Sequence, residues 1–420
     1  MNKKYKQLIG EKIGGRKMHC VQQITDKIYW IGGNDRRLER FENMFPIPKG
    51  VSYNSSLILD EKTAIIDTVD ASIRAQYLEN IKYLLQGREL DYLIVNHMEP
   101  DHCGNIEDLL MLYPNMKIVG NKKTFAFFEQ FYNTSAAENY YEIKEGDVLD
   151  LGENKLRFIG APMVHWPEVT MTYEETKGIL FSADAFGTFG TLNGNIFKDE
   201  VDFDGYYLSE MRRYYTNIVG KYGMQVQNVF KKLKDVTINM VVPLHGPIWR
   251  TPEDVNYLLD LHNKWSTSTP EKDGVVLVYG SMYGNTENTI NCIANKLAQK
   301  GVKDIKVFDV SKTHPSYIIS EAWKYSNLVL AAPTYNTGLY LVMDSLLHEL
   351  AALSYQNRKV SLIGNHTWAT GALGVMKKKF ETEFKKIEVV GEPLDVKSAL
   401  RPEQEEVLDN LTEAIIESMN

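Results

Sequence analysis

A regular alternation of strand-like and helix-like segments fills the last third of the chain. The β-rich runs are Val275–Val278, Ile305–Val310, Leu328–Ala332, Lys359–Ile363 and Ile387–Val390. The helical segments are Thr286–Lys300, Tyr317–Lys324, Leu339–Leu353, Gly374–Phe384 and Pro402–Met419. Strands that alternate with helices pair in parallel, because each helix carries the chain back to the start of the next strand. The pattern therefore predicts a doubly wound, five-stranded parallel sheet.

Three loops of this region follow predicted strands, at the sheet edge where open α/β sheets bind ligands. In the first, Ser281–Thr286, backbone N–H groups at the start of a helix and two hydroxyls form a cradle for one phosphate. An ordinary N-capped turn uses the same residue types. The other loops, Pro333–Asn336 and Gly364–Ala369, carry Tyr335 and Trp368, whose rings can cover a planar ligand. For Trp368 a plain core or interface position is the alternative.

The earlier part of the chain, from Val21 to about His262, mixes short strands and helices less regularly. Its expected elements include a hairpin over Ser56–Ile66 and helices at Ser72–Leu85, Glu107–Leu112 and Thr124–Phe131. This order is typical of a layered α+β domain. The polar, proline-containing stretch from Lys264 to Gly274 has the composition of a linker, so a domain boundary is expected there.

Seven side chains that can bind a metal ion come after buried, strand-like runs. Four stand in one motif, His97-Met98-Glu99-Pro100-Asp101-His102, after the run Tyr92–Val95. The other three are His165, Asp184 and His245, after Leu156–Ile159, Ile179–Phe181 and Ile238–Val242. Ligands at strand ends are held by a rigid sheet, so these side chains can converge on one site.

Taken singly, each of these residues has an ordinary explanation. A lone His is more often a core or surface residue than a ligand, and an Asp after a strand is more often a turn former. The density of the motif is the stronger signal, because two imidazoles and two carboxylates within six residues are costly to bury without a cation. The sequence therefore predicts a metal site. We interpret Cys103, which follows the motif, as a small buried thiol rather than a ligand.

Composition excludes several function classes. A net charge of -8 and a pI near 5.7 argue against nucleic-acid binding, which requires clustered Lys and Arg. No run approaches the roughly eighteen apolar residues that a membrane span needs. The three cysteines form no CxxC pair, which favours a reducing cytoplasm. Residues 1–20 form a basic extension to which no role is assigned.

The metal motif resembles the His-x-His-x-Asp-His loop of the metallo-β-lactamase superfamily, with Glu99 where the second His normally stands. This substitution makes the donor set harder, which suits iron better than zinc. The pattern is similar, position by position, to that of the flavodiiron proteins. The resemblance implies one iron on His97, Glu99 and His165, a second on Asp101, His102 and His245, and Asp184 bridging both. Some members leave the place of His102 to water.

The three later loops resemble those of flavodoxin and imply bound FMN. The implied FMN contacts are Ser281, Met282, Tyr283, Gly284, Asn285, Thr286, Pro333, Thr334, Tyr335, Asn336, Asn365, Thr367, Trp368 and Ala369. The implied architecture is a metallo-β-lactamase-like αββα sandwich over residues 21–265, a linker at 266–273 and a flavodoxin-like domain over 274–420.

The resemblance implies an oxidoreductase that passes electrons through FMN to a di-iron centre and reduces dioxygen to water, nitric oxide to nitrous oxide, or both. Such a role protects against oxygen or nitrosative stress. It also implies an external electron donor, rubredoxin or another reductant, and a head-to-tail homodimer or a dimer of dimers. Two alternatives stay open from the residues alone. One is a binuclear zinc hydrolase with an accessory flavodoxin module, and the other is a flavodoxin-type electron carrier whose metal site is structural.

Overall fold

The computed structural model describes residues 19–419, so residues 1–18 of the predicted basic extension lie outside the described residues. The chain divides into two compact units. The first holds the residues up to 211 and 224–259, and the second holds 212–223 and the residues from 260 onward. The short segment 212–223, which precedes the predicted linker by some distance, thus belongs with the second unit. Within the described part, no helix has the length and apolar character to cross a membrane.

Two sheets form the body of the first unit. The first sheet has the order β1 (Gln22–Thr25), β2 (Ile28–Trp30), β7 (Ser56–Leu59), β8 (Thr63–Ile66), β9 (Tyr92–Ile94), β10 (Lys117–Gly120) and β11 (Tyr140–Glu142). The second has the order β12 (Val148–Asp150), β13 (Lys155–Gly160), β14 (Thr170–Glu174), β15 (Ile179–Phe181) and β16 (Met240–Val242). Two small ladders join β3 (Gly33–Asp35) to β6 (Val51–Tyr53) and β4 (Arg40–Phe41) to β5 (Phe45–Pro46).

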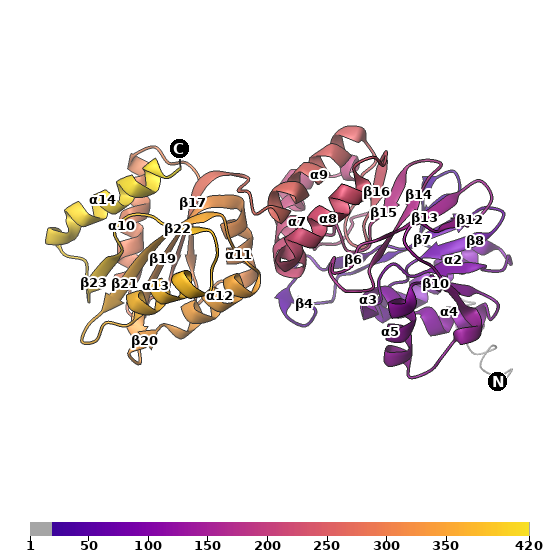
Figure 1. Ribbon diagram of the computed structural model, residues 1–420, viewed down its shortest axis with the longest axis horizontal. Helices are drawn as coiled ribbons and strands as arrows, with labels where there is room; N and C mark the ends of the chain where they lie inside the picture. The colour runs from indigo at the N-terminus through magenta and orange to yellow at the C-terminus, as the bar shows by residue number, and fades with distance from the viewer. Residues whose placement is uncertain (1–18, 420) are drawn as a thin grey trace. The chain divides into compact units, whose positions relative to one another are not determined.

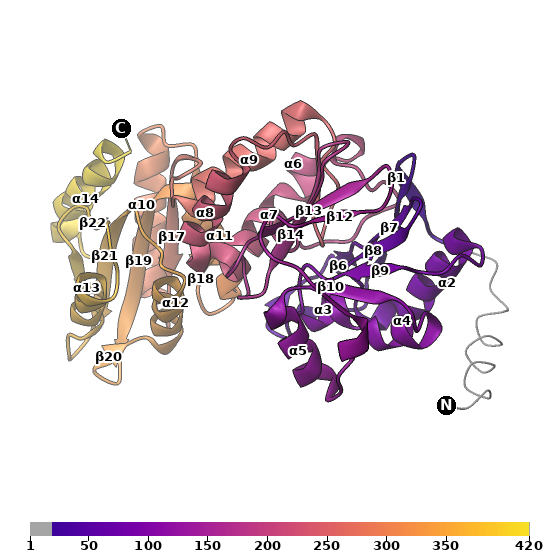
Figure 2. The ribbon, with the colours of Figure 1, turned by 45° about the vertical axis from the view of Figure 1, so that its right-hand side comes forward.

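The core of this unit lies between the two sheets. Ile58 and Ile94 of the first sheet and Phe158 and Phe181 of the second belong to one buried cluster. Figures 1 and 2 show α2, α4 and α5 beside the first sheet and α8 and α9 beside the second. The helices of this region are α2 (Arg74–Leu85), α3 (Pro100–Cys103), α4 (Ile106–Leu112), α5 (Lys122–Tyr132), α6 (Phe203–Tyr206), α7 (Leu208–Tyr214), α8 (Gly223–Leu233) and α9 (Pro252–Ser266). The predicted αββα sandwich is confirmed.

Side-chain caps account for some of the helix starts in this unit. Asn121 begins α5, because its side-chain oxygen accepts the N–H groups of Lys123 and Thr124. The helix expected from Ser72 instead opens with a short 3-10 turn, η1 (Ala71–Ile73), since the Asp70 side chain accepts the N–H of Ser72. The predicted hairpin forms as β7 and β8 in antiparallel register. The short β4–β5 hairpin was not predicted.

The second unit is a parallel sheet with helices on both faces. Its main order is β18 (Ile305–Asp309), β17 (Lys272–Tyr279), β19 (Tyr325–Tyr335), β21 (Arg358–His366) and β22 (Ile387–Val389). The helices are α10 (Asn285–Gln299), α11 (Pro315–Lys324), α12 (Leu341–Ala352), α13 (Ala372–Thr382) and α14 (Glu405–Glu417). Figure 1 shows α10 and α14 on one face of the sheet and α11, α12 and α13 on the other. The predicted doubly wound flavodoxin-like fold is confirmed.

The fifth strand position is the main departure from the prediction. One strand was expected at 387–390, but two short strands pair in parallel with β21 there, β22 with its first half and β23 (Leu394–Lys397) with its second. Gly391 lies between them with φ 72°, a conformation that favours glycine. A further short strand, β20 (Gly338–Leu339), pairs antiparallel with the end of β19. The split matters for the ligand pocket, because β23 leads directly into Ser398.

Candidate metal centre and ligand pocket

The strand ends of the first unit bring all seven predicted metal-binding side chains together. The motif begins after β9, and its second half folds into the short helix α3, which starts at Pro100. Asp184 follows β15 and His245 follows β16, and these two strands are parallel neighbours. His165 lies in the connection from β13 to β14. The strands therefore hold the motif, Asp184 and His245 near their carboxyl ends, whereas His165 stands five residues beyond β13 in a loop.

The seven side chains form two adjacent groups. In each group the candidate ligand atoms all lie within 4.8 Å of one another. The first group holds His97, Glu99, His165 and Asp184, and the second holds Asp101, His102 and His245. His97 Nε2 lies 3.2 Å from Glu99 Oε2, and His165 Nε2 lies 3.1 Å from the same oxygen. In the second group, Asp101 Oδ2 lies 3.4 Å from His102 Nε2 and 3.5 Å from His245 Nε2.

Asp184 turns one carboxylate oxygen toward each group. Its Oδ2 lies 3.3 Å from His97 Nε2 and 3.1 Å from His165 Nε2. Its Oδ1 lies 3.1 Å from His102 Nε2 and 3.5 Å from His245 Nε2. A carboxylate in this position can bind two cations at once, one through each oxygen. The His102 ring also faces the second group from a fully buried position, rather than pointing away from it.

Two of the imidazoles are oriented by hydrogen bonds on their far side. His97 Nδ1 donates to Glu168 Oε1 at 2.7 Å, and His245 Nδ1 donates to the Ser52 carbonyl at 2.7 Å. Each bond holds a ring proton on Nδ1, so Nε2 is the nitrogen that faces the cluster and that binds a cation once it is deprotonated. This is the usual way in which proteins orient histidines that bind metal ions.

The charges of the cluster are balanced by protons when no cation is present. Burial lowers the pKa of His97, but the Asp184, Glu168 and Glu99 carboxylates raise it well above its ordinary value. Burial, together with the Glu99 and Asp184 charges, raises the pKa of Asp101 to about 8. Burial and the neighbouring His102 lower the pKa of His245 to about 4. Since a cation needs deprotonated ligands, its binding here must release protons.

The donor chemistry fits two cations. The described part of the structure offers no hydrogen-bond donor to either oxygen of Asp101, although both are buried. Such an unsatisfied carboxylate is expensive in a protein interior unless a cation binds it. Three carboxylates and four imidazoles form the set, and this oxygen and nitrogen mixture suits iron. The Cys103 thiol stays outside the set, since its Sγ donates to the Met98 carbonyl and burial raises its pKa to about 12.

Three further carboxylates that sequence reasoning missed surround the centre. Glu168 has been described above. Asp67 is fully buried and accepts the backbone N–H groups of Asn96 and His97 at 2.7 and 3.2 Å, which fixes the start of the motif. Glu42 lies at the tip of the β4–β5 hairpin, and desolvation of its carboxyl group and the nearby Glu99 raise its pKa to about 7. None of these residues has a spacing signal in the sequence.

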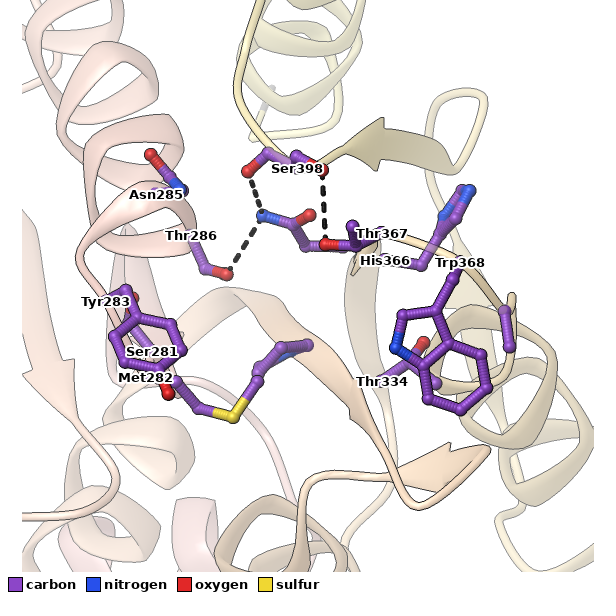
Figure 3. Close-up of a pocket in the computed structure, with 13 residues that line it drawn as sticks. Ser281, Met282, Tyr283, Asn285, Thr286, Thr334, His366, Thr367, Trp368 and Ser398 are labelled. Atoms are coloured by element: carbon purple, nitrogen blue, oxygen red, sulfur yellow. Dashed lines mark hydrogen bonds between the residues drawn. The ribbon is translucent and has the colours of Figure 1, made fainter.

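The second unit contains a cavity of about 310 Å³ at the carboxyl ends of its strands. Figure 3 shows Ser281, Met282 and Tyr283 on one side of it and Thr334 and Trp368 on the other. The lining residues are Ser281, Met282, Tyr283, Asn285, Thr286, Pro333, Thr334, Asn365, His366, Thr367, Trp368, Ala369 and Ser398. Trp368 is 79% exposed, so its ring is available to cover a ligand. All three predicted loops therefore meet at one cavity.

The lining differs from the predicted contacts in a few places. Gly284, Tyr335 and Asn336 are not among the lining residues. Tyr335 ends β19 and pairs with Gly338 of β20 in a small antiparallel ladder. His366 and Ser398 line the cavity although neither was predicted to do so. They come from the ends of β21 and β23, and β23 was the strand that the sequence did not reveal.

Comparisons with known proteins agree with this arrangement. Residues 51–246 match the ODP family β-lactamase model, and residues 277–408 match the flavodoxin model. A nitric oxide reductase of Moorella thermoacetica is 30% identical over 88% of this chain and 91% of its own. The anaerobic nitric oxide reductase flavorubredoxin of Escherichia coli is 27% identical over 91% of this chain and 78% of its own.

Solved structures of similar proteins cover both units. Rubredoxin oxygen:oxidoreductase of Desulfovibrio gigas superposes with a TM-score of 0.88, at 24% identity over 95% of this chain and 98% of its own. A variant of the flavo di-iron protein of Thermotoga maritima superposes with a TM-score of 0.85. It is 25% identical over 95% of this chain and 99% of its own. The chain belongs to the flavodiiron family. The first unit of this flavodiiron protein is its β-lactamase-like module, and the second is its flavodoxin module.

Proposed function

We propose that this flavodiiron protein is an oxidoreductase that reduces a diatomic gas, dioxygen to water or nitric oxide to nitrous oxide, and so protects the cell from these gases. The observation that carries the proposal is the Asp184 carboxylate, which presents one oxygen to each of two buried ligand groups. Relatives named as nitric oxide reductases, and one named as an oxygen oxidoreductase, support the same chemistry.

The proposed ligand sets follow the two groups. His97, Glu99 and His165 hold one iron, Asp101, His102 and His245 hold the other, and Asp184 bridges them. His102 is assigned as a ligand, because its Nε2 lies 3.1 Å from Asp184 Oδ1 inside the second group. The FMN contacts are proposed to be the predicted residues that line the cavity, with His366 and Ser398 added.

When bound, the two irons and FMN supply the redox chemistry, with electrons from an external donor such as rubredoxin. The chain itself contributes ligation, orientation and exclusion of water. Glu168 and the Ser52 carbonyl keep the His97 and His245 rings turned toward the centre. Phe41 is buried and its ring lies 5.3 Å from that of His245, so it shields the second group from solvent. Oriented ligands in a dry pocket avoid reorganisation during electron transfer.

The proposal includes a cellular location and an oligomeric state. We propose a cytoplasmic location, which the three free cysteines support. A head-to-tail homodimer, alone or as a dimer of dimers, would bring the flavin of one subunit to the iron pair of its partner.

The deciding experiment measures cofactors and gas consumption in the purified protein. We expect two irons and one FMN in each chain, and consumption of nitric oxide or dioxygen when the flavin is kept reduced. The relative rates identify the preferred gas.

Asp184→Asn, which removes the bridging charge, should lose iron, and its turnover should fall at least about a hundredfold. Asp26→Asn, at an exposed turn, is the matched control. Bound zinc with esterase turnover and no gas consumption would identify the hydrolase instead.

A further inference from the structure

The phosphate cradle of the flavodoxin module contains two hydroxyls whose oxygens are already engaged. Ser281 Oγ accepts the backbone N–H of Gly284 at 3.0 Å, and Thr286 Oγ1 accepts from Asn365 Nδ2 at 3.3 Å. A hydroxyl that accepts one hydrogen bond still has its own hydrogen to donate. We propose that Asn365 is a positioning residue for the flavin phosphate, which acts through Thr286 by keeping that hydroxyl turned as a donor toward the anion.

The orientation of the Asn365 amide is fixed by its second partner. Asn365 Nδ2 also donates to the Ser398 carbonyl at 3.2 Å. A carbonyl can only accept, so the amide nitrogen and not its oxygen must face Ser398. The remaining N–H of the same nitrogen then points to Thr286 Oγ1. The two bonds that end on Thr286 and Ser398 are dashed in Figure 3.

The hydrogen bond between Asn365 and Thr286 is shielded from water. Asn365 is 6% exposed and Thr286 is 3% exposed, so water does not readily replace either partner. Within the described residues, the Thr286 hydroxyl donates to no protein acceptor, although it lies in the first turn of α10. Its hydrogen is therefore available at the helix N-terminus, where the backbone N–H groups also favour an anion. A charged ligand gains more from such a donor than a neutral one does.

The anchor of this relay is the strand that splits off at Gly391. The Ser398 N–H donates to the His366 carbonyl at 2.8 Å, and Ser398 Oγ bonds to Thr367 Oγ1 at 3.1 Å. These contacts tie the end of β23 to the loop after β21 and hold the Ser398 carbonyl over Asn365. The relay therefore runs from β23 through Asn365 to Thr286, and from there to the phosphate.

The inference rests on FMN binding and is tested by comparing FMN with riboflavin, which lacks the phosphate. Dissociation constants for the flavin-free protein come from quenching of flavin fluorescence. Asn365→Ala should weaken FMN binding about tenfold to a hundredfold and leave riboflavin binding unchanged, since a hydrogen bond to a charged group is lost. Asn365→Asp keeps the shape but cannot donate, and its carboxylate charge also repels the phosphate, so its selective loss should be at least as large. Thr286→Val should match Asn365→Ala, and adding Asn365→Ala to it should cost nothing further.

The matched control is Asn295→Ala, an exposed asparagine on α10 whose amide bonds only within its own helix. It should leave both flavins unaffected. An equal loss of FMN and riboflavin affinity in Asn365→Ala and Asn365→Asp would show a general brace of the loop and overturn the proposal. Full additivity in the double variant would overturn it as well. Failure of the unmodified protein to bind FMN would instead contradict the proposed function, and equal binding of the two flavins would overturn only the phosphate relay.

Discussion

Glu168 stands 71 residues after His97, yet its carboxylate accepts the Nδ1–H of that imidazole at 2.7 Å. The same oxygen accepts the backbone N–H of Met98 at 2.9 Å. One buried carboxylate thus fixes both the orientation of the His97 ring and the position of the Met98 backbone at the start of the motif. Its effect on a bound iron is indirect, through the proton position and the orientation of His97.

Removing that carboxylate charge should weaken the metal centre without unfolding the protein. Glu168→Gln keeps an acceptor oxygen and the volume, so we expect iron affinity to fall about tenfold to a hundredfold. Glu168→Ala should lose more, because His97 Nδ1 is left unpaired in the interior. Chelator competition with a coloured iron ligand measures the change. Glu145→Gln, on the surface beside Lys232, is the control. Unchanged iron affinity in Glu168→Ala would refute this role.

The residues that the sequence revealed and those that it hid differ in one physical respect. Asp184 and His245 closely follow short apolar runs, and His165 lies in the loop after another, so local pattern alone places all three near strand ends. Glu168 and Glu42 reach the centre only through tertiary placement of a loop and a hairpin. No periodicity encodes that placement, because it depends on how distant segments pack together.

At the scale of elements, Asp60 joins two hairpin turns that belong to different sheets. It lies in the turn from β7 to β8 and accepts both the backbone N–H and the side-chain amide of Asn154, each at 2.7 Å. Asn154 lies in the turn from β12 to β13. Burial raises the pKa of Asp60, but the bonds from Asn154 and Lys27 outweigh it and lower the pKa to about 2.

This lowered pKa gives a pH signature. A carboxyl whose pKa is depressed by folding stabilises the protein above its unfolded value, near 4, and loses that contribution as the pH falls toward about 2. Asp60→Asn should therefore cost about 1–2 kcal/mol at pH 7. The difference from the unmodified protein should shrink between about pH 4 and pH 2. Urea unfolding at several pH values measures it, with the exposed Asp150→Asn as control. A difference that is independent of pH would contradict the assignment.

The split strand depends on Gly391. Its φ of 72° and a Cβ that would lie 2.6 Å from Leu411 Cδ1 make any side chain there costly. Gly391→Ala should destabilise the flavodoxin module by about 1–3 kcal/mol. It should also weaken FMN binding, because β23 carries Ser398. Gly301→Ala is a matched control, since Gly301 also has a positive φ, 92°, but open space around it. Thermal unfolding measures the stability of the two variants, and flavin titration measures their FMN affinity. Equal losses in Gly391→Ala and Gly301→Ala would show that the clash with Leu411 is not the cause.

The elements themselves were largely predictable because their apolar periodicity is strong. The five main strands and helices of the flavodoxin module follow the expected alternation. The split into β22 and β23 was hidden, because Gly391-Glu392-Pro393 reads as an ordinary turn after a finished strand. Whether the chain returns to the same sheet position after such a turn is decided by pairing with β21, which is a long-range contact.

At the scale of the whole molecule, the two sites lie in separate compact units of the chain. The metal candidates all fall between His97 and His245, and the flavin pocket is lined by residues from Ser281 to Ser398. Turnover requires electrons to pass from one site to the other. The proposed head-to-tail dimer supplies a partner subunit for that transfer.

Mixed dimers test this arrangement directly. Asp184→Asn should lack iron, and Thr286→Asp should lack FMN, because its carboxylate repels the phosphate. Each variant alone should be inactive. If the flavin of one subunit serves the iron pair of its partner, a dimer with one copy of each variant has one intact pair. An equal, randomised mixture should recover about a quarter of the normal rate. Gas consumption is measured on mixtures whose mixed dimers are verified with two affinity tags. Absence of recovery would show that transfer occurs within one subunit.

The late position of β23 also sets an order of events during protein synthesis. Every candidate ligand of the metal centre has been made once the ribosome has passed His245, and domains generally fold as they emerge. The flavin cradle must wait for Ser398, which follows Thr286 by more than a hundred residues. Iron can therefore be loaded on a nascent chain that cannot yet hold its flavin. A ribosome-bound chain that is stalled after the first module should already bind metal. It should show no absorbance from bound FMN.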